Sequence, residues 1–272
     1  MTAKPAGGTA ESGTAETGPP GPEALIPPPP WQRLPDRQSR RRREPISREA
    51  IVTAAVQLLD REGLAGLSMR RLGDELGAGA ASLYWHVGSK DGLLDLVLDE
   101  IIGEQQVPDP EPARWQEQVK EVARAQRRAS LRHPYVVRIS IGRIPMGPNA
   151  LRYSERVLAI LRAGGLPPHL AVQGYLLLIA TVNGFTVDET GVEDSGTPDR
   201  DPATLQQAAD LARDYIASLP VSLFPNMTGL ADEFALADPG ERFELLIDIF
   251  VDGLARRSGQ SAMPAPTRRR PG

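Results

Sequence analysis

The sequence contains no cysteine, and its aromatic side chains make up only 5% of 272 residues. Without cysteine the chain forms no disulfide, offers no thiol nucleophile and holds no zinc through sulfur, a composition that suits a reducing cytosol. Hydrophobic residues still reach 40%, so we expect a core of Leu, Ile, Val and Ala. No apolar run reaches the roughly 18 residues of a membrane span, and the N-terminus lacks the apolar segment of a secretory signal. We therefore expect a cytoplasmic protein with no membrane partner.

An excess of positive charge is also missing, because the formal net charge is −4. This excludes a globally basic nucleic-acid binder, so any binding to DNA must come from local positive charge. One local cluster ends the segment 1–45, which holds ten of the 26 prolines and no periodic apolar pattern. We predict that this segment is disordered and ends in a flexible arginine arm: Arg40, Arg41, Arg42 and Arg43. A second disordered tail is expected over 258–272.

Between these tails the sequence predicts an all-α fold. Ser47, Ser68 and Ser89 each precede a stretch in which apolar residues recur every three or four positions, so each is expected to cap a helix. Glycines are expected to end or separate these helices at three positions: Gly63, Gly77 and Gly79. Further helical patterns cover 112–132, 135–141, 148–163, 167–189, 202–219 and 239–257. No strand-like alternation interrupts them.

Residues 66–94 predict a helix-turn-helix DNA-binding unit within a first domain at 46–92, followed by a second domain at 93–257. A capped short helix, a glycine-bearing turn, a second short helix and a capped third helix follow one another at the required spacing. Leu83 and Val87 are needed in the core, so the second short helix exposes its other face. That face carries Ala81, Ser82, Tyr84 and His86, which can meet base edges or phosphates.

Acidic residues outnumber basic ones across 47–104, so few cations are available to this first domain. Arg70 can reach a guanine edge or a phosphate, and Lys90 begins a helix whose free N–H groups also favour a phosphate. The arginine arm would supply further backbone or minor-groove contacts. Two competing interpretations are that Tyr84 and Trp85 are core aromatics and that the arm is only a solvated tail. The crowding of Tyr84 and Trp85 on so short a helix favours a DNA-contacting role for these two side chains.

The stretches LLDREGLAGLSMRRLGDELG and SLYWHVGSKDGLL make residues 47–104 resemble the DNA-binding domain of the TetR family of bacterial regulators, especially its tetracycline-repressor branch. The resemblance implies a homodimer that reads a palindromic operator. It implies base-facing positions at Arg70, Ala80, Ala81, Ser82 and Tyr84, and phosphate contacts at Trp85, His86 and Lys90. We include Ser68, at the start of its helix, in the DNA-contacting set. Family members often carry larger polar residues where this chain has Gly79, Ala80 and Ala81, so direct base readout is expected to be sparse.

The second half of the chain resembles the effector and dimerisation domains of the same branch. In such domains two long helices pair with their mates across a two-fold axis in a four-helix bundle. The matching segments, 167–189 and 239–257, contain YLLLIATVNGF and FELLIDIFVDG, which are apolar on too many sides for a surface helix. The alternative is that both are simply central helices of one chain.

The second domain is expected to bind a small molecule. Asn183 interrupts the apolar run of one long helix and needs a hydrogen-bonding partner if it is buried. The same helix carries Gln173, Tyr175 and Thr181. The resemblance places further candidates on elements that would wall the cavity: Trp115, His133, Arg138, Arg143, Met146 and Asn149. Each of these residues also has a purely structural explanation.

We expect no cofactor and no metal. Of three histidines, His86 belongs to the DNA-binding domain and His169 opens a helix, which leaves only His133. A metal-chelated ligand such as tetracycline is therefore disfavoured, and a largely apolar natural product or drug-like molecule is expected. Binding of this effector would move the helix over 89–104 and release the operator. We expect a repressor, because the resemblance favours one.

Two other function classes compete with this prediction. An enzyme would need a nucleophile or an acid–base pair in a recognisable arrangement, and none is found; GAGAAS at 77–82 lacks the preceding strand and the GK[ST] ending of a phosphate loop. An effector-independent activator or architectural DNA-binding protein would use the long apolar helices for dimerisation alone. The absence of any ligand-sized cavity would favour this second alternative.

Overall fold

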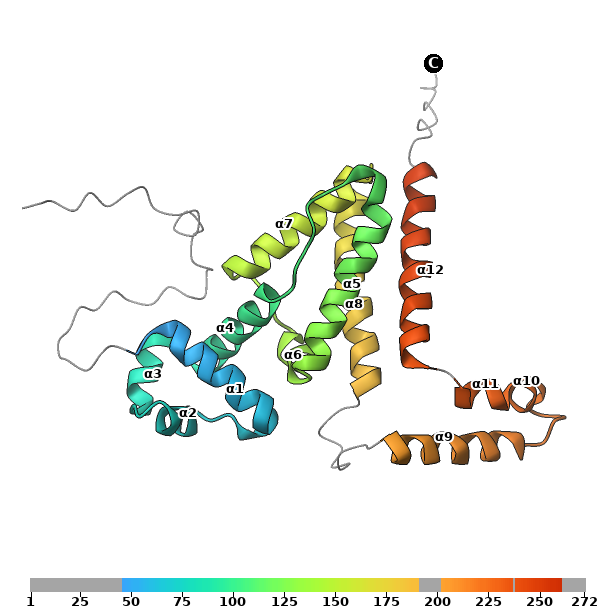
Figure 1. Cartoon of the computed structure of the whole chain (residues 1–272), viewed down its shortest axis with the longest axis horizontal. Helices are drawn as coiled ribbons and strands as arrows, with labels where there is room; N and C mark the ends of the chain where they lie inside the picture. The colour runs from blue at the N-terminus through green and yellow to red at the C-terminus, as the bar shows by residue number, and fades with distance from the viewer. Residues whose placement is uncertain (1–45, 191–201, 237, 261–272) are drawn as a thin grey trace, which may run out of the picture.

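The computed structural model describes residues 46–190, 202–236 and 238–260, and this part of the chain is helical with no strand, as expected for an all-α fold. The DNA-binding head consists of α1 (Arg48–Gly66), α2 (Met69–Glu75) and α3 (Ala80–Val87), and α4 (Lys90–Gly103) joins it to the body. The body contains α5 (Trp115–Arg132), α6 (Tyr135–Ser140), α7 (Pro148–Ala163), α8 (Pro168–Thr190) and α12 (Pro239–Gln260). Three further helices, α9 (Pro202–Ala217), α10 (Pro225–Gly229) and α11 (Ala231–Leu236), pack on one another and stand apart from the main bundle (Figure 1).

The predicted arginine arm at Arg40–Arg43 lies outside the described residues, as does most of the predicted C-terminal tail. The last helix, α12, runs to Gln260, so it continues three residues past the expected helix end at 257. The predicted domain boundary between Gly92 and Leu93 falls in the first turn of α4.

Serine caps begin three of the first four helices, α1, α2 and α4, as the sequence predicted. The hydroxyl of Ser47 accepts a hydrogen bond from the backbone N–H of Ala50 at 3.1 Å. The hydroxyls of Ser68 and Ser89 each accept an equivalent hydrogen bond from the backbone N–H of the residue three positions later, at 3.2 and 2.9 Å. Each cap satisfies an N–H that the helix itself cannot pair, which typically stabilises a helix by about 1 kcal/mol.

Glycines end the first two helical segments. Gly63 has φ 64° and ψ −172°, so the regular part of α1 stops there and a short extra turn leads to Gly66. Gly77, in the turn between α2 and α3, has φ 61°. Because this left-handed backbone conformation strains any residue with a Cβ, glycine is the residue that suits this turn.

One hydrophobic core holds the head together and extends beyond it. The stripe predicted from the sequence is buried, with Ile51, Leu58, Leu72, Leu83 and Leu93 completely removed from solvent. The same core continues through α4 into α6, where it takes in 135–137 and 139. The head and the first turns of the body therefore share one packed interior, so a shift of α6 must be felt by the head.

A second core fills the body between α5, α7, α8 and α12. Ile102 of α4 packs against both cores. In the body, α8 is the central helix, with Ala171, Leu178 and Val182 buried on one side.

The sequence-based expectation that no segment is long and apolar enough to span a membrane was wrong. Among the described residues, α8 meets that test, with 23 residues and a mean hydropathy of 1.6 over its best window. Polar residues on α8, such as Asn183 and Glu189, are few and widely spaced, so the most apolar stretch of the helix carries almost no charge. Within one chain α8 packs against α5, α6, α7 and α12, but only 28% of its most apolar window is buried, so this packing covers part of the apolar surface.

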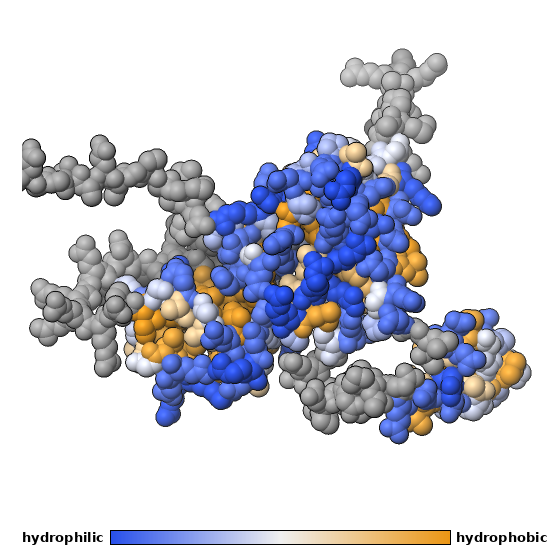
Figure 2. All heavy atoms as spheres, in the orientation of Figure 1, coloured by the Kyte–Doolittle hydropathy of each residue, from blue (hydrophilic) through white to orange (hydrophobic). Residues whose placement is uncertain are grey.

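Large apolar side chains remain exposed on both long helices. On α8 they are Val172, Leu176 and Leu177, and on α12 they are Leu245 and Ile249, each exposed by 46 to 62%. Figure 2 shows hydrophobic surface along the outer side of the bundle at α12 and on the separate group of α9–α11. Exposed apolar area of this extent on adjacent helices is typical of a surface that another chain covers.

Candidate functional site

The third helix presents its polar and aromatic face to solvent. Leu83 and Val87 are buried, as predicted, while Ser82, Tyr84 and Trp85 are exposed, the indole of Trp85 by 62%. The imidazole of His86 is half-buried and meets the Trp85 ring edge-on at 4.6 Å between centroids. Partial burial, and then the nearby Arg48 guanidinium, lower the pKa of His86, which favours the neutral imidazole.

Among the basic residues next to this face, Arg70 is the one whose guanidinium is unengaged within the described part of the chain. Arg61 pairs with Glu75, and Arg71 pairs with Glu62, both at 2.5 Å. Arg70 lies exposed at the start of α2 with no such partner. A free, exposed guanidinium beside the third helix is the group that a guanine edge or a phosphate would engage.

Lys90 has a structural role that its sequence position did not reveal. Its ammonium donates a hydrogen bond to the carbonyl of Leu67 at 2.8 Å, and so holds the loop that leads into α2. An ammonium has three N–H donors, so the predicted phosphate contact stays open to it. Of the other predicted DNA-contacting residues, Ser68 and Ala81 are exposed, and Ala80 is half-buried against the head core.

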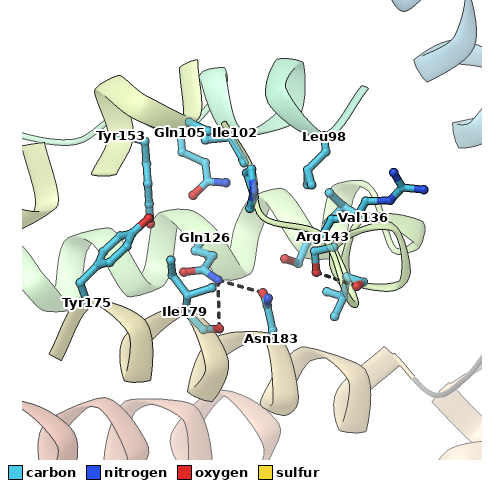
Figure 3. Close-up of a pocket in the computed structure, with 15 residues that line it drawn as sticks. Leu98, Ile102, Gln105, Gln126, Val136, Arg143, Tyr153, Tyr175, Ile179 and Asn183 are labelled. Carbon is cyan, nitrogen blue, oxygen red and sulfur yellow. Dashed lines mark hydrogen bonds between the residues drawn. The ribbon is translucent and has the colours of Figure 1, made fainter. Parts of the chain in front are cut away.

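A cavity of about 150 Å³ lies in the body, enclosed by α4, α5, α6, α7 and α8 (Figure 3). At one end the walls include Leu98 of α4 and Val136 of α6, and Arg143 lies beside them. At the other end the side chains are polar and come from four different segments: Gln105, Gln126, Tyr153 and Tyr175. The cavity is therefore amphipathic along its length.

The amide of Gln126 has a fixed orientation. Its Nε2 donates to the Oδ1 of Asn183 at 2.9 Å and to the carbonyl of Ile179 at 3.4 Å. A backbone carbonyl only accepts, so the nitrogen must face α8 and the oxygen must face the other way. That oxygen is buried and has no hydrogen-bond partner. Asn183 thus finds the partner that its place in an apolar helix required.

Two tyrosines lie next to Gln126. The hydroxyl of Ser154 donates to the carbonyl of Ala150 at 2.7 Å, so in the 2.5 Å contact between Ser154 and Tyr175 the tyrosine must be the donor. The hydroxyl of Tyr153 is buried without a partner. Burial raises the pKa of Tyr153, and secondarily the neighbouring Tyr175 does so, which keeps this phenol protonated.

Three aspartates on one face of α4 connect the DNA-binding head to the cavity wall. Asp91, Asp95 and Asp99 follow one another at four-residue spacing. The guanidinium of Arg143, a cavity-lining residue, donates to Asp91 Oδ1 at 2.8 Å and to Asp95 Oδ1 at 2.6 Å. The backbone N–H of Ala150, a second lining residue, donates to Asp99 Oδ1 at 2.9 Å. We call these three residues the α4 aspartate row.

The carboxylate of Asp99 acts as the N-terminal cap of α7. It is 8% exposed and accepts hydrogen bonds from the N–H groups of Asn149 and Ala150. Burial nevertheless outweighs these bonds and raises the pKa of Asp99. Gly147 lies directly against it, since a Cβ built on Gly147 would overlap the carboxylate. Only glycine at this position leaves room for the cap.

Of the ten candidate ligand-binding residues, Arg143, Tyr175 and Asn183 line the cavity. Gln173 is exposed and Thr181 half-buried on other sides of α8. Met146 and Asn149 line a neighbouring groove at the junction of α1, α4 and α7. Arg138, on α6, is half-buried and does not line the cavity. Residues that share a helix with Asn183 fail to reach the cavity because only every third or fourth one faces the same way.

Trp115 and His133 also lie away from the cavity. The indole of Trp115 packs on Gly164, where it helps to close the second core. His133 is buried between the head and the body, with Asp60 Oδ1 2.6 Å from Nδ1 and Glu104 Oε2 3.3 Å from Nε2. Tyr135 donates to the same Asp60 oxygen at 2.8 Å. This polar cluster joins α1 to the body and has no access to the ligand cavity.

The sequence analysis missed Gln105, Gln126 and Tyr153. For Gln126 a signal was present, because it continues the buried stripe of α5 that contains Val119, Val122 and Ala123. A glutamine at such a position must find a polar partner or face a cavity. Gln105 follows the end of α4 in an irregular stretch, so periodicity gives no indication of where its side chain points.

No group of three or more potential metal-ligating side chains occurs among the residues that were placed. The polar end of the cavity instead offers amide and phenol oxygens. These are hydrogen-bonding groups for an organic molecule, and the walls facing them are apolar.

Comparisons with known proteins agree with this architecture. Residues 51–97 match the family "Bacterial regulatory proteins, tetR family", and residues 107–258 match "Tetracyclin repressor-like, C-terminal domain". The HTH-type transcriptional repressor DrrR1 of Streptomyces coeruleorubidus is 30% identical over 269 residues, which cover 94% of this chain and 96% of DrrR1. An HTH-type transcriptional regulator of Saccharopolyspora erythraea is 44% identical over 135 residues, or 50% of this chain and 56% of that relative.

Solved structures of ActR from Streptomyces coelicolor are also similar. Apo ActR superposes with a TM-score of 0.73 at 42% identity, covering 81% of this chain and all of ActR (100%). ActR in complex with actinorhodin gives a TM-score of 0.72 at 44% identity, covering 79% of this chain and 99% of ActR.

A helix-turn-helix head joined through one helix to a body with an internal amphipathic cavity defines a ligand-responsive transcriptional regulator. The family matches span both of these parts. The chain belongs to the TetR family of bacterial regulators, and the expected function class, a ligand-responsive DNA-binding repressor, is confirmed.

Proposed function

We propose that the protein acts in the cytoplasm as a homodimeric repressor, without catalysis, and that an effector in the body cavity releases it from a palindromic operator. One observation carries this proposal: Leu98 and Ile102 of α4 form part of the cavity wall, and α4 continues directly into the head. At about 150 Å³ the cavity is smaller than the roughly 300–1,000 Å³ that drug-sized ligands occupy. A ligand of that size must therefore displace wall elements, and α4 is one of them.

The exposed apolar faces of α8 and α12 support a homodimer. Pairing these helices with the same helices of a second copy would bury Leu176, Leu177, Leu245 and Ile249 in a four-helix bundle. Two heads held in this way would fit half-sites about one helical turn, roughly 34–36 Å, apart. A change in the position of α4 in each copy would alter that spacing.

For the DNA contacts we propose the exposed groups of the head. Ser82 and Tyr84 of α3 would enter the major groove with Arg70, and Trp85 and Lys90 would meet phosphates. The remaining predicted contacts, at Ser68, Ala80, Ala81 and His86, surround this face. The arginine arm would add contacts to the backbone or the minor groove.

For the effector we propose a ligand of the kind that ActR binds, because ActR is 44% identical and was solved in complex with actinorhodin. The test is fluorescence anisotropy of the DNA upstream of the protein's own gene, with actinorhodin as the first probe. We expect the probe to weaken operator binding by 5- to 150-fold, the usual range of coupling between two sites. An operator complex that persists while the probe is bound would contradict release by effector.

A further inference from the structure

We propose that the effector is a molecule with an apolar body that donates hydrogen bonds, through hydroxyl or similar groups at one end, to an acceptor cluster made by Gln105, Gln126, Tyr153 and Tyr175. This proposal rests on the cavity being the effector site and names the chemistry that the site selects. It is carried by unpaired polar atoms that converge at one end of the cavity.

Three buried side-chain atoms lack a hydrogen-bond partner among the described residues: Gln105 Oε1, Gln126 Oε1 and the Tyr153 hydroxyl. All three belong to side chains that line this one cavity. Gln126 and Tyr153 are 6% and 8% exposed, so water does not readily satisfy them. A buried polar atom without a partner is unfavourable by itself and is rare in native proteins, so their gathering in one cavity indicates a bound polar group.

The cluster accepts more hydrogen bonds than it can donate. Gln126 has both of its Nε2 contacts directed at α8, which leaves only its oxygen for a ligand. Tyr175 donates its single proton to Ser154, so its oxygen can only accept. The Tyr153 hydroxyl and the Gln105 amide can both donate and accept, so the excess of acceptors comes from Gln126 and Tyr175. A ligand that fits must therefore bring hydrogen-bond donors to this end (Figure 3).

The opposite end explains why such a molecule would also act on the head. Leu98, Val136 and Val137 belong to the core that the head shares with α4 and α6. The acceptor cluster would fix the ligand's polar end against α5, α7 and α8. Its apolar end would then press on α4 and α6. Affinity and selectivity would reside at the polar end, and the switching at the apolar end.

The experiment measures direct binding by calorimetry to the full-length protein, using naphthalene-1,5-diol as the donor probe and 1,5-dimethoxynaphthalene as its non-donating analogue. We expect the diol to bind at least tenfold more tightly than the dimethoxy compound, since each lost donor leaves a buried acceptor unpaired. Equal or tighter binding of the dimethoxy compound, or no binding of the diol at 1 mM, would overturn the proposal.

Tyr153→Phe gives the sharpest variant, because the hydroxyl it removes has no partner in the protein. We expect this variant to fold with an unchanged or higher thermal midpoint and to lose most of its preference for the diol. Gln126→Met should lose the preference as well, whereas Ile179→Val, an apolar lining change, should affect both probes alike. A diol preference that survives in both Tyr153→Phe and Gln126→Met would refute the assigned cluster. Because binding is measured without DNA, failure here is distinct from a failure of effector-induced release.

Discussion

Asp99 shows how one carboxylate can serve two helices. It lies on α4, and it caps α7 through the N–H groups of Asn149 and Ala150. Its burial is unfavourable for the charged form, although the positive end of the α7 dipole is adjacent. The position of α4 against the cavity wall therefore depends on the Asp99 carboxyl group, whose pKa is raised in the folded state.

This raised pKa predicts a pH-dependent stability. The folded state binds the Asp99 proton more tightly than the unfolded state does, so the contribution of Asp99 is fully present below the ordinary value of 3.8 and is lost as pH rises through the folded pKa. Asp99→Asn cannot ionise. The free energy of unfolding of Asp99→Asn, relative to wild type, should increase as pH rises from 4 to 8, measured by urea denaturation. The exposed Asp74→Asn is the control and should show a flat difference; a trend of the opposite sign for Asp99→Asn would mean that the amide bonds outweigh burial.

Tyr84 allows a test of the DNA-contacting face at a single side chain. Because Leu83 and Val87 carry the packing of α3, the exposed Tyr84 ring contributes little to folding. Tyr84→Ala should abolish operator binding in a gel-shift assay and leave the oligomeric state unchanged. Tyr84→Phe separates the hydroxyl from the ring, and an operator affinity that is unchanged in Tyr84→Ala would show that this residue does not contact DNA.

At the scale of elements, α4 is the part that the head and the body have in common. Its apolar side packs into the head core, Ile102 reaches the second core, and the α4 aspartate row faces the segment from Arg143 to Ala150. Two of the residues that contact this row, Arg143 and Ala150, line the cavity. The α6–α7 connection is thus tied to α4 by charged and hydrogen-bonded contacts at three successive helical turns.

Removing one of these ties should uncouple binding from release. In Arg143→Gln the ion pairs to Asp91 and Asp95 are lost, while the acceptor cluster is untouched. We expect effector affinity to change less than threefold and the effector-induced fall in operator affinity to shrink at least fivefold, as measured by anisotropy with and without effector. The exposed Arg128→Gln serves as the matched control. If the effector lowers the operator affinity of Arg143→Gln as much as that of the wild type, α4 is moved by apolar contacts alone.

The head helices could be predicted closely from the sequence because their ends are marked locally. Serine caps, Gly63 and Gly77 fix where these helices begin and end, and the apolar stripe fixes which face is buried. The cavity residues could not be predicted in this way. Whether Gln126 or Gln173 faces the ligand depends on how α5 and α8 rotate against each other, which is a property of the packed bundle. The sequence therefore identified the helix that carries Asn183 and misplaced most of the other lining residues.

The whole molecule leaves two apolar helix faces and a separate helical group exposed in one chain. The exposed residues of α8 and α12 lie side by side on the bundle, and α9–α11 carry more, among them Leu211, Tyr215 and Phe234. An isolated chain with this much apolar surface would associate readily. A symmetric dimer buries each such residue twice, once per copy, so single substitutions there have doubled effects.

Because one substitution in a symmetric dimer acts in both copies, a single change on α12 can test the proposed dimer interface. Ile249→Glu places a charge on the exposed face of α12 in both copies, where burial of each isoleucine is worth about 1.5–3 kcal/mol. We expect the variant to be monomeric at micromolar concentration in analytical ultracentrifugation, and to bind the operator at least tenfold more weakly. Leu131→Glu, an exposed leucine on α5, should stay dimeric. A dimeric Ile249→Glu would place the interface elsewhere.

The contact between Gly147 and Asp99 has a consequence for the mutations that arise in this gene under selection. Any side chain at position 147 displaces the Asp99 carboxylate, although this position belongs to neither hydrophobic core. We therefore expect a missense change at this glycine to leave a folded repressor that still finds its operator and has lost part of its response to effector. In a population under selection for permanent silencing of the controlled genes, codon 147 should be a recurrent target.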